Sequence, residues 1–187
     1  MGRLRDPCDA EDELLVDRFL GGDRAAFDTL VRRYQDPVYR FVTWSIDDDA
    51  DDVAQDVFVE VYRSLATWRR RSTFRTWLYG VARNVYRRHV RRGAVRDHTH
   101  GEIDVDDLPG AGNPAHRVAQ SDANALLLAA IARLPADQRV TLMLRAWEGL
   151  RYDEIAAALD VPVGTVRSRL HTARRTLAAA IAETDDE

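Results

Sequence analysis

The 187-residue sequence contains a single cysteine, Cys8, and no lysine. One cysteine excludes a disulfide within the chain and a zinc site built on several thiolates. The longest apolar runs are too short to span a bilayer, and the first residues lack the apolar stretch of a signal peptide. We therefore expect a cytoplasmic protein without membrane insertion. The low counts of glycine (10) and proline (6) favour helices over sheet.

The positive charge of the chain is concentrated in one stretch. All 27 basic residues are arginine, and 31 acidic residues make the formal net charge −4. Eleven of the arginines fall between Arg63 and Arg96, where there is no Asp or Glu. Aromatic residues lie among them: Trp68, Phe74, Trp77, Tyr79 and Tyr86. Guanidinium groups neutralise phosphates and flat rings stack on unpaired bases, so the stretch predicts a nucleic-acid strand as partner. The alternative is a solvated arginine face on an ordinary helix.

The first half of the chain shows apolar residues at helical spacing. A helix is expected after Gly22, with a kink or break at Pro37. The acidic cluster at 47–52 suits the N-terminus of a second helix, since negative charge is favourable there. Ser72 or Thr73 can cap a third.

The periodicity fails between Gly93 and about Pro114, where acidic residues gather. Such a segment predicts a flexible linker between two domains. Helical periodicity returns near Val118, with Pro135 at the start of a helix and Gly149 after its end. We expect an all-α protein of two small helical domains. Its parts are an N-terminal tail (1–10), a first domain (11–92), a linker (93–116) and a second domain (117–182).

The second domain ends in a predicted helix-turn-helix. Helices over Tyr152–Leu159 and about 163–181 flank the turn Asp160-Val161-Pro162. The inward positions are Ile155, Ala156, Leu159, Val161, Val166 and Leu170. The outward positions of the second helix are Thr165, Arg167, Ser168, Arg169, His171, Thr172 and Arg175. Such a helix can lie in the DNA major groove, and no acid between positions 161 and 182 opposes the phosphates. The alternative is a helical hairpin with a polar face.

Several motifs then point to one family. The segment Gly164-Thr-Val-Arg-Ser-Arg-Leu170, followed by Ala173-Arg174, resembles the promoter-reading end of bacterial sigma factors. In the first half, three segments resemble successive parts of sigma region 2: Gly22 to Tyr34, Asp51 to Phe58 and Thr73 to Asn84. Their order and spacing are similar to those of the extracytoplasmic-function (ECF) sigma factors, which keep only regions 2 and 4. The resemblance covers about residues 11–92 and 117–181.

The resemblance implies a promoter-specificity subunit that binds core RNA polymerase, recognises the −35 and −10 elements and promotes DNA melting. It implies contacts with the β′ clamp helices and the β flap, with promoter DNA, and with an anti-sigma factor. The residues expected to bind the polymerase are Asp52, Gln55, Asp56 and Glu60. Those expected at the melted −10 element are Arg69, Arg70, Arg71, Arg75, Tyr79, Arg83, Asn84, Tyr86 and Arg87. Phe74 and Trp77 lie on the apolar stripe and are expected to be mainly structural.

Two places depart from the family pattern. The loop reads Arg69-Arg70-Arg71, where relatives usually mix arginine with Gly, an acid or Asn, so the captured base is left open. His171 and Thr172 stand where relatives often place an aromatic residue and a cation. The DNA sequence preference of this part of the helix is therefore left open as well.

Two other functions fit the sequence less well. A stand-alone helix-turn-helix regulator with an N-terminal sensor or dimerisation domain would not need an acid-free arginine stretch with exposed rings. A hydrolase or nuclease would need acids converging from separate elements, whereas those at 47–52 begin one helix. The sequence shows no nucleophile–base set and no phosphate loop, so we expect neither an enzyme nor a cofactor. His98, His100 and His116 are loosely spaced without a cysteine nearby, and no metal site is expected.

Overall fold

The computed structural model describes residues 7–45, 50–97 and 122–185, with side chains for 8–45, 50–92 and 127–180. These residues form eight α-helices and one short 3₁₀ helix, without a strand. The predicted all-α class is confirmed. Most of the predicted linker, with His98, His100 and His116, lies outside the described residues.

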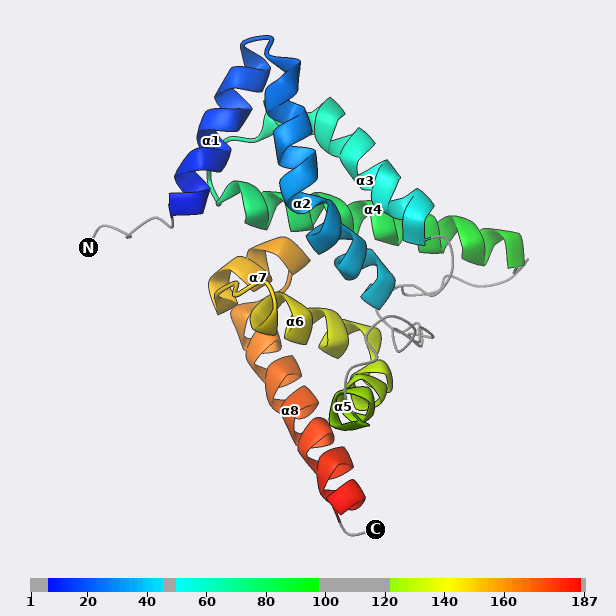
Figure 1. Ribbon diagram of the computed structural model, residues 1–187. Coiled ribbons are helices and arrows are strands. Elements are labelled where there is room, and N and C mark those ends of the chain that lie inside the picture. Colours follow the sequence, from blue (N-terminus) through cyan, green and yellow to red (C-terminus); the bar gives the residue numbers. More distant parts are fainter. Residues whose placement is uncertain (1–6, 46–49, 98–121, 186–187) are drawn as a thin grey trace.

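The N-terminal half is a four-helix unit, drawn from blue to green in Figure 1. Its elements are α1 (Pro7–Leu20), α2 (Arg24–Ser45), α3 (Ala50–Ser64), the 3₁₀ helix η1 (Leu65–Thr67) and α4 (Phe74–Asp97). Their apolar stripes meet in one core, in which Leu30, Val38, Phe41, Phe74 and Leu78 are almost fully buried. Burying such side chains contributes about 1.5–3 kcal/mol each, and this helical unit depends on it.

The helix ends in this half follow local chemistry. Gly22 has a φ of 101°, a left-handed conformation that glycine adopts without strain, and it separates α1 from α2. Thr73 Oγ1 accepts a hydrogen bond from the Thr76 amide at 3.2 Å and caps α4, as predicted. Pro37 lies inside α2, which continues past it to Ser45. Likewise α4 continues past Gly93 to Asp97.

A buried polar cluster holds α1 on α2. The Asp12 side chain is fully buried and accepts hydrogen bonds from Arg33 Nη1, at 2.6 Å, and from the Tyr34 hydroxyl. Burial raises the pKa of the Asp12 carboxyl, while the bonds from Tyr34 and Arg33 oppose that rise. The cluster fixes the position of α1, from which two acidic side chains reach the arginine loop described below.

The C-terminal half contains α5 (Asp122–Ala132), α6 (Ala136–Ala146), α7 (Tyr152–Leu159) and α8 (Val163–Asp185). Pro135 occupies the N-cap of α6, as predicted. In the turn between α7 and α8, Asp160 has a φ of 51°, a left-handed conformation that Asp tolerates better than most residues. The predicted inward residues Ile155, Ala156, Leu159, Val166 and Leu170 are buried, and the helix-turn-helix is confirmed.

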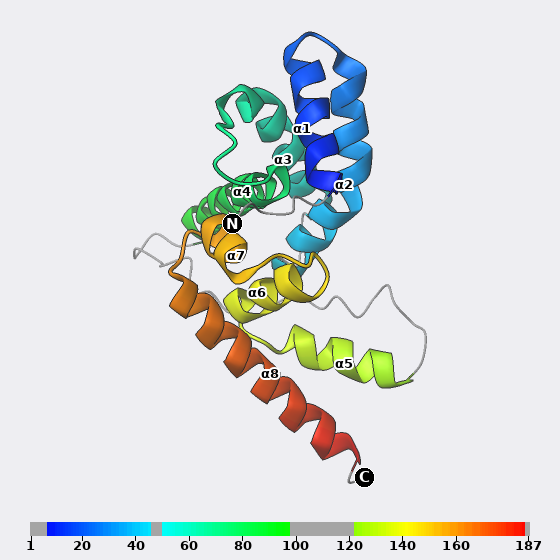
Figure 2. The same cartoon turned by 90° about the vertical axis from the view of Figure 1, so that its left-hand side faces the viewer.

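The two halves pack against each other. Helix α7 lies along α4, and α6 lies against the end of α2, in both views of the ribbon (Figures 1 and 2). The indole rings of Trp44 and Trp147 have centroids 5.5 Å apart across this contact. Within the described ranges, no helix combines the length and apolarity that crossing a membrane would require.

Candidate nucleic-acid interface

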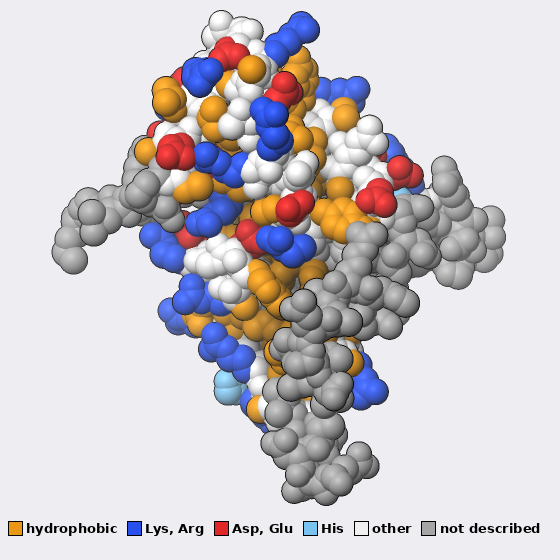
Figure 3. Space-filling model, in the orientation of Figure 1, with side chains coloured by type: hydrophobic (Ala, Val, Ile, Leu, Met, Phe, Trp, Pro, Cys, Tyr) orange, Lys and Arg blue, Asp and Glu red, His pale blue; other side chains and the backbone are white. Residues whose placement is uncertain are grey.

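The exposed face of α8 is the first candidate surface. Val166, Leu170 and Ala173 are buried on one side of the helix and fix its orientation. The opposite side carries the predicted recognition residues: Arg167, Ser168, His171, Thr172 and Arg175 are exposed, and Thr165 is half-buried. Arginine side chains gather along this edge of α8 at the lower left of Figure 3. The face combines phosphate-binding cations with short polar side chains near the helix N-terminus, as major-groove recognition requires.

Arg169 does not belong to that face. Its Nε donates to the Asp137 carboxylate of α6 at 2.8 Å, and its side chain is only 16% exposed. The prediction of an outward Arg169 is wrong because this position lies at the flank of the buried stripe of α8. There the guanidinium joins α8 to the first turn of α6.

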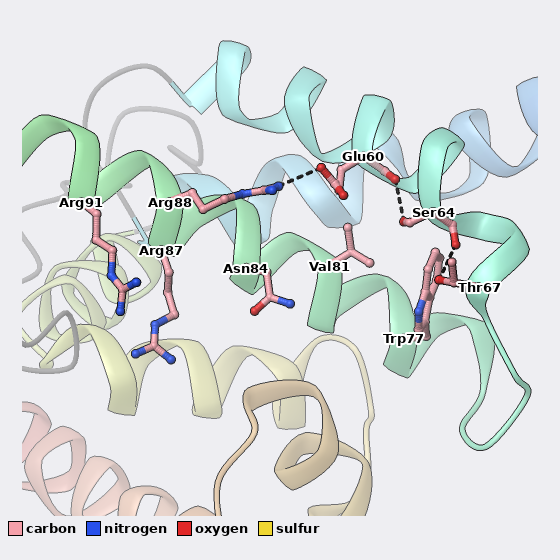
Figure 4. A pocket seen from close by; sticks show the side chains of 9 residues that line it. All are labelled: Glu60, Ser64, Thr67, Trp77, Val81, Asn84, Arg87, Arg88 and Arg91. Atoms are coloured by element: carbon pink, nitrogen blue, oxygen red, sulfur yellow. Dashed lines mark hydrogen bonds and ion pairs between the residues drawn. The ribbon is translucent and has the colours of Figure 1, made fainter.

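A groove between α3 and α4 is the second candidate surface. It encloses about 510 Å³ and is lined by nine residues. Those from α3 and η1 are Glu60, Ser64 and Thr67; those from α4 are Trp77, Val81, Asn84, Arg87, Arg88 and Arg91 (Figure 4). The Trp77 ring, the Asn84 amide and the guanidiniums of Arg87 and Arg91 all lie on one side of α4 in this view.

The groove is cationic. Three guanidiniums face it against one carboxylate, and that carboxylate, Glu60, pairs with Arg88 at 2.9 Å. Among the described residues, no ion pair neutralises Arg87 or Arg91. A flat ring, an amide and such guanidiniums suit a single nucleic-acid strand, whose bases stack and whose phosphates need cations. Asn84 and Arg87 were predicted here; Arg88, Arg91 and Thr67 were missed. Arg88 lies four residues after Asn84, and Arg91 four residues after Arg87. This helical spacing could have indicated the two arginines.

The loop between η1 and α4 carries three consecutive arginines with different environments. Arg70 has a φ of 55° and its guanidinium pairs with Asp17 and, at 3.8 Å, with Glu13 of α1. It also lies 5.8 Å from the centre of the Trp68 ring. These contacts fix the loop on α1, whereas Arg69 and Arg71 are exposed and open to a phosphate.

The other side of α4 faces the C-terminal half. Tyr79 was predicted to contact DNA, but its side chain is completely buried. Its ring centroid lies 5.5 Å from that of Phe41. Burial, with the nearby Glu148 carboxylate, raises the pKa of its hydroxyl. The prediction is wrong in this arrangement because the turn after α6 and helix α7 cover this side of α4.

Three further residues predicted to contact DNA are only partly exposed. Arg83, Tyr86 and Arg87 line a small cavity of about 50 Å³, bounded also by α2, α6, α7 and Arg169 of α8. Arg75 is half-buried, near the Asp12 cluster. Of the expected −10 residues, the structure therefore brings Asn84 and Arg87 into the open groove and keeps Arg83 and Tyr86 at the contact between the halves.

The outer face of α3 is the third candidate surface. Asp52, Gln55 and Asp56 are exposed there, as expected. Glu60, one turn after Asp56, pairs with Arg88 of α4 and stands at the edge of this face next to the groove. Val59, which is 38% exposed, and the exposed Arg63 continue the face along the helix. Sequence reasoning missed Val59 because a valine in a periodic helix is normally assigned to the core.

Comparisons with known proteins match both halves of the chain. A model described as Sigma-70 region 2 matches residues 30–96, and one described as Sigma-70, region 4 matches residues 124–177. The RNA polymerase sigma-H factor of Pseudomonas aeruginosa is 36% identical over 181 residues, covering 91% of this chain and 94% of that protein. The ECF RNA polymerase sigma-E factor of Escherichia coli is 37% identical over 175 residues, covering 89% and 92%.

The chain belongs to the ECF sigma factors.

Two solved structures share its fold. One is CnrH in complex with the cytosolic domain of CnrY, with a TM-score of 0.65, 25% identity and coverage of 92% of this chain and 98% of that one. Another is the sigma factor RpoE in complex with the anti-sigma factor NepR from Bartonella quintana, with a TM-score of 0.65, 23% identity and coverage of 83% and 96%.

Family membership assigns this ECF sigma factor to transcription initiation, with DNA bound by the helix-turn-helix of region 4. The alternative of a stand-alone regulator with a sensor domain is not favoured, because the α1–α4 unit contains the match to region 2. Helices α5–α8 contain the match to region 4. Both candidate nucleic-acid surfaces of this ECF sigma factor thus lie within matched regions.

Proposed function

We propose that this chain recruits core RNA polymerase to promoters through three surfaces that act on three different partners. The exposed face of α8 reads the −35 element as duplex. The groove between α3 and α4, with Arg69 and Arg71, holds the single strand of the melted −10 element. The outer face of α3 docks on the β′ clamp helices, and region 4 meets the β flap. The chain performs no covalent chemistry, and its DNA and polymerase partners place it in the cytoplasm.

The observation that carries the proposal is the presence of two nucleic-acid surfaces of different kinds on one chain. The α8 face is a convex helix with short polar residues, which fits a major groove. The α3–α4 groove is concave and has a ring, an amide and cations, which fits a separated strand. A protein that bound only duplex DNA would need the first surface and not the second. We assign residues 11–92 to region 2 and 117–182 to region 4, joined by a linker.

The partner surface on α3 follows from its charge and shape. Asp52, Gln55 and Asp56 present carboxylates and an amide around the exposed Val59. Carboxylates at the rim steer a basic partner surface, and an apolar residue between them contributes buried area. An anti-sigma factor is a further proposed partner, supported by the similar sigma factor solved in complex with the anti-sigma factor NepR.

The test is a double charge reversal on α3. Asp52→Arg with Asp56→Arg places two cations on the docking face, and we expect co-purification with core RNA polymerase to be lost. Asp28→Arg with Asp36→Arg is the matched control, since it changes net charge equally on exposed positions of α2. Circular dichroism checks that both variants fold. If the α3 variant binds core polymerase as well as the control variant does, the proposed docking surface on α3 is refuted.

A further inference from the structure

The two walls of the groove between α3 and α4 differ in their hydrogen-bonding groups. The α4 wall carries donors, namely three guanidiniums and an amide that belong to Arg87, Arg88, Arg91 and Asn84. The opposite wall, built by α3 and η1, carries a carboxylate and two hydroxyls: Glu60, Ser64 and Thr67. Trp77 lies at one end of the groove and Arg91 at the other (Figure 4). A strand in the groove therefore has a different set of polar groups on each side.

The hydroxyls of the second wall have already used their protons. Ser64 Oγ donates to the backbone carbonyl of Glu60 at 2.6 Å, and Thr67 Oγ1 donates to that of Ser64 at 2.6 Å. A hydroxyl has one proton, so only lone pairs are left for a ligand. An ionised carboxylate also only accepts, and Arg88 Nη2 bonds one of the two Glu60 oxygens at 2.9 Å. We call Glu60, Ser64 and Thr67 the acceptor wall, because none of the three side chains has a proton to donate.

A tryptophan ring lies beside the acceptor wall. Trp77 is half-buried, and its ring packs against those of Phe74 and Trp68, with centroids 5.9 and 6.4 Å apart. These contacts fix the orientation of the ring and leave its remaining part in the groove. Ser64 and Thr67 lie at the same end of the groove as Trp77 (Figure 4). A base that stacks on Trp77 can therefore present its polar edge to these acceptors.

We propose that the acceptor wall selects an unpaired base with an exocyclic amino group, adenine or cytosine, and rejects thymine and guanine. Adenine carries this donor at N6 and cytosine at N4, whereas guanine and thymine have the carbonyl oxygens O6 and O4 at the equivalent positions. A carbonyl that faces Ser64 Oγ or Thr67 Oγ1 sets acceptor against acceptor, and polar groups left without partners cost affinity. The inference rests on the proposed function, because it applies only if the groove holds the melted strand.

The two walls then have separate tasks. Arg87 and Arg91 neutralise phosphates, which every nucleotide has, so the α4 wall contributes affinity without sequence preference. Ser64 and Thr67 face base edges, so the acceptor wall contributes sequence preference. Glu60 adds a further acceptor oxygen and also holds Arg88 across the groove. Neither Ser64 nor Thr67 has a charge or a ring, so sequence patterns do not single them out.

Base analogues that lack only the amino group test the proposal. The probes are short single strands of thymidine with one altered base at the centre. One pair carries adenine or purine, and the other carries cytosine or 2-pyrimidinone, the second member of each pair being the first without its amino group. Each strand is titrated by fluorescence anisotropy against the full chain bound to core RNA polymerase, with core polymerase alone as the reference. We expect the amino-bearing strand of at least one pair to bind on the order of tenfold more tightly than its analogue.

Variants of the acceptor wall connect this preference to its residues. Ser64→Ala with Thr67→Val removes both hydroxyls, and the ratio of the two affinities should fall toward one. Thr67→Ser keeps the hydroxyl and should keep the preference. Thr29→Val is the matched control: Thr29 Oγ1 also donates to a backbone carbonyl, that of Ala25 at 2.9 Å, but it lies on α2, outside the groove. The ratio is the readout because a general effect on folding would lower both affinities together.

The outcomes separate the inference from the proposed function. Equal affinity for both members of each pair, while Arg87→Ala still weakens strand binding, would overturn the acceptor wall and leave the proposed function standing. A preference that persists in Ser64→Ala with Thr67→Val would also overturn it, because another group would then read the base. If the chain adds no strand binding to that of core polymerase alone, the strand site of the proposed function is refuted and the acceptor wall with it.

Discussion

The buried guanidinium of Arg139 donates a hydrogen bond to the backbone carbonyl of Trp44, 95 positions earlier in the chain, at 2.6 Å. Its Nη1 also donates to the carbonyls of Ala132, at 2.8 Å, and Leu134, at 3.2 Å. One side chain therefore satisfies acceptors at the end of α5, in the turn between α5 and α6, and at the end of α2. Arg139 therefore connects α5 and α6 within region 4 and also ties region 4 to region 2.

Replacing Arg139 by lysine should lower stability. Lysine keeps the charge but cannot reach three carbonyls at once, so buried acceptors lose their donors at a cost of about 2–4 kcal/mol. Urea unfolding followed by circular dichroism measures the change. Arg133→Ala is the control: Arg133 is exposed on the neighbouring turn, and its loss should stay within about 0.5 kcal/mol. An equally small effect of Arg139→Lys would show that the buried bonds contribute little.

Base reading by α8 is tested at Arg167. The residue is exposed near the N-terminus of the recognition helix, so Arg167→Ala should cost about 1–3 kcal/mol on the preferred −35 sequence. Mutated −35 sequences should be less affected, because they have already lost that contact. The readout is initiation with core polymerase on a set of promoters. A uniform loss across all sequences would identify Arg167 as a phosphate contact.

The groove between α3 and α4 is tested by its salt dependence. Arg87→Ala removes one cation, and the slope of log K against log salt for single-stranded DNA should fall by about 0.7. Asn84→Ala should lower affinity without changing that slope, since an amide releases no counterion. Both are titrated with core polymerase present. Arg24→Ala, an exposed position at the start of α2, should leave affinity and slope as they are. Equal behaviour of Arg87→Ala and Arg24→Ala would place the strand elsewhere.

The pH dependence of stability reports on Asp12. Its pKa is raised in the folded protein, chiefly by burial, so the folded chain holds this proton more tightly than the unfolded chain. The contribution of Asp12 to stability therefore falls as pH rises from the usual carboxyl value, about 3.9, through the raised value. Compared with Asp12→Asn at each pH, the native chain should lose relative stability over that range and then level off. A relative gain with rising pH would contradict the raised pKa.

The sequence was sufficient for features that depend on nearby residues. The helix-turn-helix follows from apolar spacing at Ile155, Leu159, Val166 and Leu170 and from the turn between them, all within a short segment. Thr73 was identified as a cap because its hydrogen-bond partner lies three residues away. Local periodicity and capping chemistry specify such elements, so they can be predicted without knowledge of long-range packing.

Features that depend on distant segments could not be predicted in the same way. Tyr79 sits among arginines and resembles a stacking platform, but the surface that buries it includes Glu148, almost seventy positions later. Arg169 alternates with exposed residues of α8, yet Asp137 of another helix holds it. Glu60 shares the acidic character of Asp56 but pairs with Arg88 across the groove. In each case the partner comes from an element whose position only the fold determines.

The most direct test of the account is run-off transcription with purified core RNA polymerase on a library of promoter sequences. Addition of the chain should start new transcripts from templates that share two separated elements, and Asp52→Arg with Asp56→Arg should abolish them. If the chain starts no transcripts from any template, or starts them equally from templates without either element, the central claim of promoter-specific initiation is contradicted.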